Sequence, residues 1–404
     1  MAGSNPSARK RQPIPRGIAR TGPVLFSYGF RPFFLAAGIW AIAAMALWIG
    51  ALIASWEIGG SYGGAYWHAH EMLFGYSSAA LAGFLLTAVP NWTGRLPVSG
   101  TPLAFLFALW CAGRLTMLAP DALGLLPSLL IEASFLPMLL AICAREIIAG
   151  KKWKDLKILG GIAALALANI GFHTLIATGG DVGLANRLAV SAYVMLVSIM
   201  GGRVVPSFTR NWLSKHHVDR LPVSYNRFDA LVLLVSLAAL TLWVLMPGTM
   251  WSALACGAAA LLHLARLLRW HGWQVWDEKL VLILHLGYGF VPFGFGLIAL
   301  AQLGWFEPVA ALHVFTVGVI GVMTLAIMTR ATRGHTGLPL AASPTTIASY
   351  AALLIAAVSR PMTSFWPAAH MELLTVAGMG WIFAFGLYVF EYGPVLSRQR
   401  RERG

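Results

Sequence analysis

Long runs of apolar residues, separated by short polar segments, make up most of the chain after its first thirty residues. A helix needs roughly 20 mostly apolar residues to cross a bilayer. Backbone groups inside the hydrocarbon must be hydrogen-bonded within the chain, so these runs predict helices and not open strands. We predict twelve spans, near residues 32–55, 67–90, 102–119, 125–149, 156–178, 184–206, 228–246, 250–268, 280–301, 308–328, 343–358 and 371–390.

The pattern predicts an all-α, polytopic integral membrane protein with about twelve transmembrane helices in one bundle. Residues 1–31 form a basic cytoplasmic segment and residues 32–392 the transmembrane domain. Within that domain the polar connection 207–227 forms a cytoplasmic loop between two six-helix halves, although no clear sequence repeat relates the halves. Residues 393–404 form a basic cytoplasmic tail.

The basic residues give an independent test of these spans. If the N-terminus is cytoplasmic, all of the 29 lysines and arginines except Arg114, Arg187 and Arg360 fall on the cytoplasmic side. Short cytoplasmic loops of membrane proteins carry this excess of positive charge. One missed or invented helix would destroy the asymmetry. It therefore supports the helix count and predicts that both termini are cytoplasmic.

Composition agrees with a membrane protein, since 58% of residues are hydrophobic and 11% charged, against about 25% charged in soluble domains. The net charge of +14 lies in short loops and at the termini, which indicates a topology signal and attraction to anionic lipid, not nucleic-acid binding. The three cysteines form no CxxC or CxxCH motif. This excludes a disulfide framework and a covalent haem attachment site.

Histidines within the apolar runs are the strongest chemical signal, because ionisable side chains at membrane depth mark functional sites by default. With a helical rise of roughly 1.5 Å per residue, His173 and His313 lie roughly 25 Å above the cytoplasmic ends of their helices. His68 and His70 begin the second span at the same outer level. We therefore expect four imidazoles to meet there, and imidazole suits iron, copper and zinc. Two further histidines, His263 and His285, lie nearer the cytoplasmic side and belong to a second site or to none.

The segment Trp67-His-Ala-His-Glu-Met72 restricts how these ligands are used. On a regular helix, residues two apart point about 200° apart, so His68 and His70 do not bind one ion together. We predict that one ligates a metal and the other serves a second centre or a hydrogen bond. Glu71 shares a face with His68 and is a further candidate ligand. The alternative is an interfacial cap in which Trp67 is a belt residue.

Polar residues also gather at the cytoplasmic end of the tenth span, where Arg330, Arg333 and His335 lie within a few residues. Arginines there could hold the propionates of a haem or an anionic lipid by charge-assisted hydrogen bonds. Snorkelling of long side chains at a helix end is the alternative explanation.

These segments together resemble the NnrS family of bacterial nitric-oxide-response membrane proteins, over nearly the whole chain. The second and tenth spans carry the most specific part of the resemblance. The matching segments are Phe30–Phe34, WHAHEM at 67–72, 82–94, 201–203 with 209–211, His285–Tyr288, His313–Gly321, 328–330 and 334–337.

The resemblance implies a twelve-helix protein of the bacterial inner membrane that binds haem and copper. It also implies a role in nitric oxide metabolism or in protection from nitrosative stress. The family pattern points at seven residues for these sites, whereas His173 is placed by depth alone. The seven are His68, His70, Glu71, His285, His313, Arg330 and His335.

Three functions remain open at this point. The first is a protein with non-covalent, b-type haem held by histidine, and with copper, that binds or converts nitric oxide using an unknown electron donor. It is analogous to haem–copper oxidases in helix count and histidine usage. The second is a secondary transporter, since twelve helices are common among carriers, although many histidines and few intramembrane acids argue weakly against it. The third is a non-catalytic sensor, or a haem or metal delivery protein.

Overall fold

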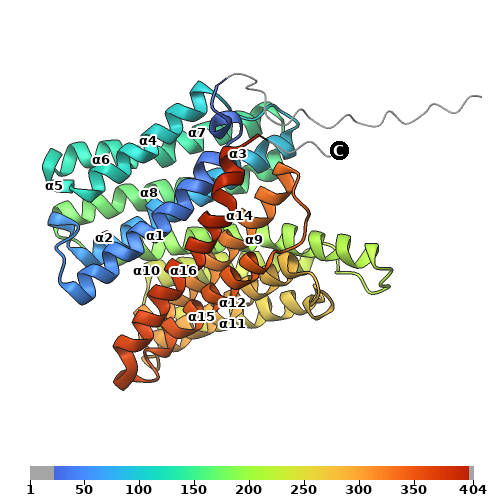
Figure 1. Cartoon of the computed structure of the whole chain (residues 1–404). Helices are drawn as coiled ribbons and strands as arrows, with labels where there is room; N and C mark the ends of the chain where they lie inside the picture. Colours follow the sequence, from blue (N-terminus) through green and yellow to red (C-terminus); the bar gives the residue numbers. More distant parts are fainter. Residues whose placement is uncertain (1–21, 400–404) are drawn as a thin grey trace, which may run out of the picture.

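The structure, a computed structural model, describes residues 22–399, and every regular element in that range is helical (Figure 1). The basic N-terminal segment up to residue 21 and the last residues of the tail lie outside the described range. The principal helices are α1 Phe30–Ala54, α2 Gly64–His70, α3 Ser77–Thr93, α4 Thr101–Leu118, α5 Pro120–Leu123, α6 Leu125–Ala133, α7 Phe135–Ala149, α8 Leu156–Thr178, α9 Val182–Lys215, α10 Arg227–Leu245, α11 Met250–Leu268, α12 Lys279–Gln302, α13 Pro308–His313, α14 Val322–Thr336, α15 Pro344–Met362 and α16 His370–Ser397.

Among the described residues, eleven continuous helical segments are long and apolar enough to cross a membrane. Helix α15 coincides with the remaining predicted span but is less apolar than the other eleven. The positions of the two ends of the described chain show whether α15 crosses the membrane. Arg31 at the start of α1 donates hydrogen bonds to the carbonyl oxygens of Leu396 and Arg398, both at 2.7 Å. Because the two ends meet on one side, the number of crossings is even, and α15 supplies the twelfth.

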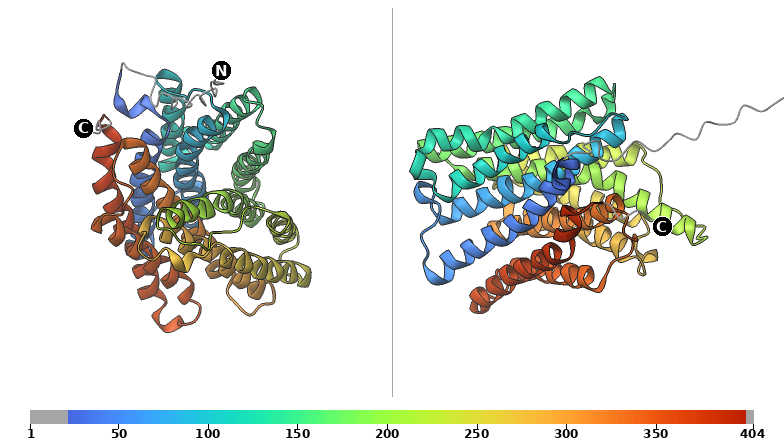
Figure 2. Two further views of the ribbon diagram at one scale, coloured as in Figure 1. Left: turned by 90° about the vertical axis from the view of Figure 1, so that its right-hand side faces the viewer. Right: turned by 45° about the horizontal axis from the view of Figure 1, so that its top comes forward.

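The chain passes around the bundle in sequence order. Viewed from one end, it runs from the blue and teal helices through green and yellow to red (Figure 2, left). The segment Gly64–Thr93 is the most enclosed: 83% of its apolar 18-residue stretch is buried, against 33% of the corresponding stretch of Phe30–Ala54. Large apolar side chains such as Leu234 and Leu261 point outward instead. The bundle is therefore built for a lipid environment, with its ionisable groups kept inside.

Two of the enclosed helices are interrupted by π-helical turns. One π segment, η3, covers Glu71–Tyr76 and joins α2 to α3; the other, η6, covers Val314–Gly321 and joins α13 to α14. Each begins at the residue after a histidine, His70 or His313. π turns are rare overall, but those that occur are often at functional sites. Both π segments therefore indicate that this end of the bundle carries a functional site.

The connection between the two halves is shorter than the sequence pattern predicts. Helix α9 continues past Pro206 to Lys215, so part of the expected loop 207–227 is helical. A proline removes one backbone donor, and membrane helices tolerate this loss. Asn226 and Asp229 form a capping box at the start of α10, which ends the connection.

Candidate metal centres

Three atoms that could ligate a metal converge in a fully buried cluster, at the end of the bundle opposite the start of α1 and the end of α16. They are Nε2 of His70, Nε2 of His173 and Oε2 of Glu132. The imidazole nitrogens are 3.2 Å apart, and the carboxylate oxygen lies 3.4 Å from His70 and 2.9 Å from His173. Ligands about 2.0–2.1 Å from a tetrahedral ion lie about 3.3 Å from one another. One ion position between the three atoms therefore satisfies all of them.

Each ligand comes from a different helix, and each is held by a second polar group. Glu71 Oε1 lies 2.8 Å from Nδ1 of His70, and the hydroxyl of Tyr62 lies 2.5 Å from Nδ1 of His173. The amide nitrogen of Asn169 donates to Oε2 of Glu132 at 2.8 Å. Such outer partners fix the orientation and tautomer of metal-binding histidines.

One arginine ties the two acidic side chains of the cluster together. Arg114, on α4, donates to Oε2 of Glu71 and to Oε1 of Glu132, each at 2.5 Å. All three side chains are almost completely buried. Glu132 therefore presents one oxygen to Arg114 and the other to the imidazoles.

The cluster lacks positive charge. An ionised Glu71 can only accept a hydrogen bond, so Nδ1 of His70 carries the proton and Nε2 presents a lone pair. That lone pair faces Oε2 of Glu132 and, at 3.2 Å, Oδ1 of Asn169, which are also acceptors. Two carboxylates against one guanidinium leave a net negative charge, and an uncompensated buried charge is costly. The arrangement is stabilised by a cation at its centre, either a metal ion or a proton.

Tyr62 lies outside the spanning helices, in the 3₁₀ turn Gly60–Tyr62 that follows α1. Burial, reinforced by the negative charges of Glu132, Asp121 and Glu71, raises the pKa of Tyr62 well above its usual value. Its phenol therefore keeps its proton at physiological pH. It remains available as a hydrogen-bond partner of His173.

A cavity of about 320 Å³ lies next to the cluster, on the other side of α2. Its walls are mainly apolar, with Trp48 and Trp381 among the large side chains. Its polar lining includes His68 from α2, His313 from α13 and Arg360 from α15, the side chains among the lining that can carry charge. The volume is at the lower end of the range for small-molecule and cofactor pockets.

His313 has one ring nitrogen that its helix does not use. Its Nδ1 lies 2.6 Å from the carbonyl oxygen of Val309. A carbonyl only accepts, so Nδ1 carries the proton and Nε2 keeps its lone pair for a ligand. His68 stacks on the ring of Trp48 at 4.7 Å, and its Nδ1 is buried with no hydrogen-bond partner among the described residues.

The structure thus divides the four outer histidines between two places, where the depth argument expected them to meet at one. His70 and His173 belong to the cluster, and His68 and His313 to the cavity. Glu71, expected to share a face with His68, contacts His70 and Arg114 instead. Glu71 is therefore a candidate outer partner of His70, and Glu132 is the candidate acidic ligand.

Three other candidates lie at the end of the bundle where α1 starts and α16 ends. His285 bonds to the hydroxyl of Thr209 at 2.7 Å, the guanidinium of Arg330 lies 4.0 Å from the ring of Phe208, and His335 stacks on the ring of Tyr28. The structure brings none of the three to the cluster or the cavity.

His263 has structural partners on both sides of its ring. Its Nε2 lies 2.8 Å from the hydroxyl of Ser236, and its Nδ1 lies 2.9 Å from the hydroxyl of Tyr288. Because both ring nitrogens are used within the protein, neither is free to bind a metal.

Sequence reasoning missed Glu132, Asn169, Arg114 and Arg360 as site residues. A signal was present, because Glu132 and Arg114 are ionisable residues within apolar runs, the same feature that singled out the histidines. Arg114 and Arg360 are also two of the three basic residues that violate the charge asymmetry. A buried arginine that breaks this charge pattern needs an acidic partner, and Arg114 has two, Glu71 and Glu132.

The two glutamates of the cluster predict a graded effect on metal binding. Glu132→Gln should weaken metal affinity by more than about 100-fold because it removes a charged ligand. Glu71→Gln should weaken it by about 10–100-fold, as expected for an outer partner of a ligating histidine. Titration of the metal-free protein measures both. Glu146→Gln is the matched control, since Glu146 is a buried carboxylate paired with Arg95 elsewhere. Equal affinities for Glu132→Gln and Glu146→Gln would remove Glu132 from the site.

Comparison with known proteins places the chain in a family. No curated protein matched it. A profile of the NnrS family, described as NnrS protein, matches residues 24–400, which is nearly the whole chain. This range includes both π-helical segments, the buried cluster and the cavity. The chain belongs to the NnrS family.

Proposed function

We propose that this protein binds haem in the cavity of His68 and His313 and a second transition metal, copper, at the cluster of His70, Glu132 and His173. With these groups it acts on nitric oxide in the bacterial inner membrane, in nitric oxide metabolism or in protection from nitrosative stress. One observation carries the proposal: two separate imidazole sites adjoin across a single turn of α2, which supplies His68 to one and His70 to the other.

The residues of the cavity fit a haem. His313 offers a lone pair on Nε2, and His68 lines the same cavity. The apolar walls suit a macrocycle, and Arg360 provides a positive charge for a propionate. When bound, a haem would supply a redox-active iron able to bind nitric oxide. Arg360 takes the role that the sequence assigned to Arg330.

The residues of the cluster fit a divalent transition metal. Two imidazoles and one carboxylate suit copper, iron or zinc, and the family resemblance favours copper. Glu132 compensates ionic charge, Glu71 and Tyr62 orient the two imidazoles, and Arg114 holds both carboxylates in place. Burial of the cluster excludes bulk water from the site.

Absorbance and metal analysis of the purified protein test the proposal. We expect a Soret band that shifts when nitric oxide is added, together with about one equivalent of copper by elemental analysis. A folded protein that lacks haem and metal, and that binds a solute instead, would favour a transporter. Steady consumption of nitric oxide with an electron donor indicates an enzyme, whereas binding without consumption indicates a sensor.

A further inference from the structure

Three long, enclosed helices of the bundle share one residue register. They are the segments Gly64–Thr93, Val182–Lys215 and Pro308–Thr336, the second, sixth and tenth spans. Near the end of each segment, a residue with an aromatic ring is followed by threonine. At the same distance in sequence before that threonine, each segment has a histidine or an asparagine. The matched residues are Trp92-Thr93, Phe208-Thr209 and His335-Thr336, and, earlier, His70, Asn186 and His313.

Contacts between these helices repeat in the same sense. The guanidinium of Arg203 in the sixth span lies 5.3 Å from the ring of Trp92 in the second. Arg330 occupies the matching position in the tenth span and lies 4.0 Å from the ring of Phe208 in the sixth. Each arginine thus reaches the matching ring of the preceding helix. The register and the direction of these contacts therefore repeat from the second span to the sixth and from the sixth to the tenth.

A second cavity of about 90 Å³, called the axial cavity below, is lined by residues of these three helices. Matched residues from all three helices line it, and their side chains are only half-buried although most of their neighbours are fully buried. Side chains that remain partly accessible inside a bundle border empty space. Two matched layers are Leu81, Val197 and Thr324, and Phe84, Met200 and Ile327.

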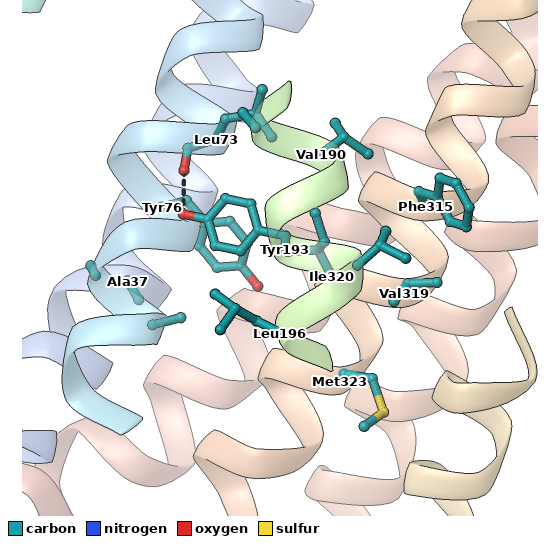
Figure 3. Packing of buried hydrophobic residues seen from close by; sticks show 14 of the residues in the cluster. Ala37, Leu73, Tyr76, Val190, Tyr193, Leu196, Phe315, Val319, Ile320 and Met323 are labelled. Atoms are coloured by element: carbon teal, nitrogen blue, oxygen red, sulfur yellow. Dashed lines mark hydrogen bonds between the residues drawn. The ribbon is translucent and has the colours of Figure 1, made fainter. Parts of the chain in front are cut away.

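The layer above joins this axial cavity to the cavity of His313. It consists of the matched residues Ser77, Tyr193 and Ile320, of which Ser77 and Ile320 line both cavities. In Figure 3, Tyr193 extends from α9 and its hydroxyl donates to the carbonyl of Leu73, at 2.8 Å, with Ile320 close by. Only this layer of side chains separates the two spaces.

The polar side chains that line the axial cavity are already paired. The hydroxyl of Ser77 donates to the carbonyl of Met72 at 2.7 Å, and the hydroxyl of Thr324 lies 2.5 Å from that of Tyr76. Tyr193 is paired as described above. A cavity without free polar groups holds water poorly, and engineered apolar cavities stay dry and take up xenon. The space therefore suits a small apolar solute.

We propose that the axial cavity is a binding site for an apolar diatomic gas, which crosses the layer of Ser77, Tyr193 and Ile320 to reach the cavity of His313. The identification of that gas as nitric oxide rests on the proposed function. The site itself rests on the matched apolar layers, the volume and the shared lining. The gas concentrates in the axial cavity from the surrounding lipid, and Ile320 limits its passage.

Xenon tests the site without any need for haem. Crystals of the full chain under xenon pressure should show xenon between Val197 and Thr324. Val197→Trp should abolish this density by filling the cavity. If the tryptophan variant does not fold, Val197→Phe is the smaller cavity-filling variant to use in its place. Leu234→Trp, on the lipid-facing side of α10, should leave it unchanged. Absence of xenon from the unmodified cavity, or full occupancy in a folded Val197 variant, overturns the proposal.

The rate of ligand binding tests the passage. In the haem-loaded protein, Ile320→Trp should slow association of nitric oxide at least about tenfold, and Ile320→Ala should accelerate it; rates are compared per haem bound, because Ile320 also lines the haem cavity. Equal rates in both variants overturn the passage. A protein that takes up xenon but holds no haem refutes the proposed function and supports the gas site. A haem protein whose axial cavity excludes xenon overturns the gas site alone.

Discussion

His313→Ala is expected to abolish haem binding and to leave the copper content unchanged, whereas His173→Ala should do the reverse. His313 presents an unprotonated Nε2 to the cavity because Nδ1 carries the proton and donates it in a hydrogen bond to the carbonyl oxygen of Val309. His173 contributes its Nε2 to the cluster instead. The ratio of Soret absorbance to protein, with elemental analysis of the same sample, measures both effects. His68→Ala should also lower the haem content, because His68 lines the same cavity.

His285→Ala is the matched control for this pair. His285 is an intramembrane histidine that bonds to Thr209 at the other end of the bundle. Its loss should therefore change neither the haem content nor the copper content. Full haem with an unchanged spectrum in both His68→Ala and His313→Ala would show that the cavity assignment is wrong. Loss of both metals in either single variant would indicate that the two centres depend on each other for folding.

Arg114→Leu should produce the largest loss of stability of any arginine substitution in the described chain. It leaves the carboxylates of Glu71 and Glu132 buried without their shared cation. Removing one partner of a buried ion pair costs about 3–5 kcal/mol, because the remaining charge is uncompensated. Unfolding of the metal-free protein by SDS in detergent micelles measures the free energy of unfolding. Arg114→Lys should recover part of the loss, since it restores the charge but not both hydrogen bonds.

Arg145→Leu provides the comparison for a surface pair. Arg145 is exposed, and Glu146 keeps a second partner in Arg95. Surface ion pairs contribute about 0–1 kcal/mol, so this variant should unfold close to the unmodified protein. If Arg114→Leu were no less stable than Arg145→Leu, Glu71 and Glu132 would have to be neutral in the fold, and the argument for a cation at the cluster would fail.

The apolar runs were sufficient to predict the helices, because a bilayer restricts backbone to helical segments of a certain length. They could not predict the π turns at Glu71 and Val314, since a π turn depends on how neighbouring helices pack and not on hydrophobic periodicity. The contact of Glu71 with His70, in place of the expected one with His68, was likewise not predicted.

Depth along each helix was predictable, but direction around it was not. His173 and His313 lie at the same end of the bundle, as the residue count indicated, yet they serve different sites. Which helices are neighbours decides this, and nothing in the run of α6 shows that it lies beside α8. Glu132 could therefore be suspected from the sequence but not joined to His173. The repeat was similarly hidden, because it relates thirds of the chain and not halves.

The hydrogen bonds from Arg31 to Leu396 and Arg398 hold the start of α1 beside the end of α16. Joining adjacent ends by a short linker and opening the chain elsewhere is tolerated in many folds. Here the connection between α9 and α10 emerges after an even number of crossings, as the native ends do. A permuted chain opened at that connection would keep every helix in its present direction across the membrane. The order in which the helices are synthesised is therefore separable from the architecture they form.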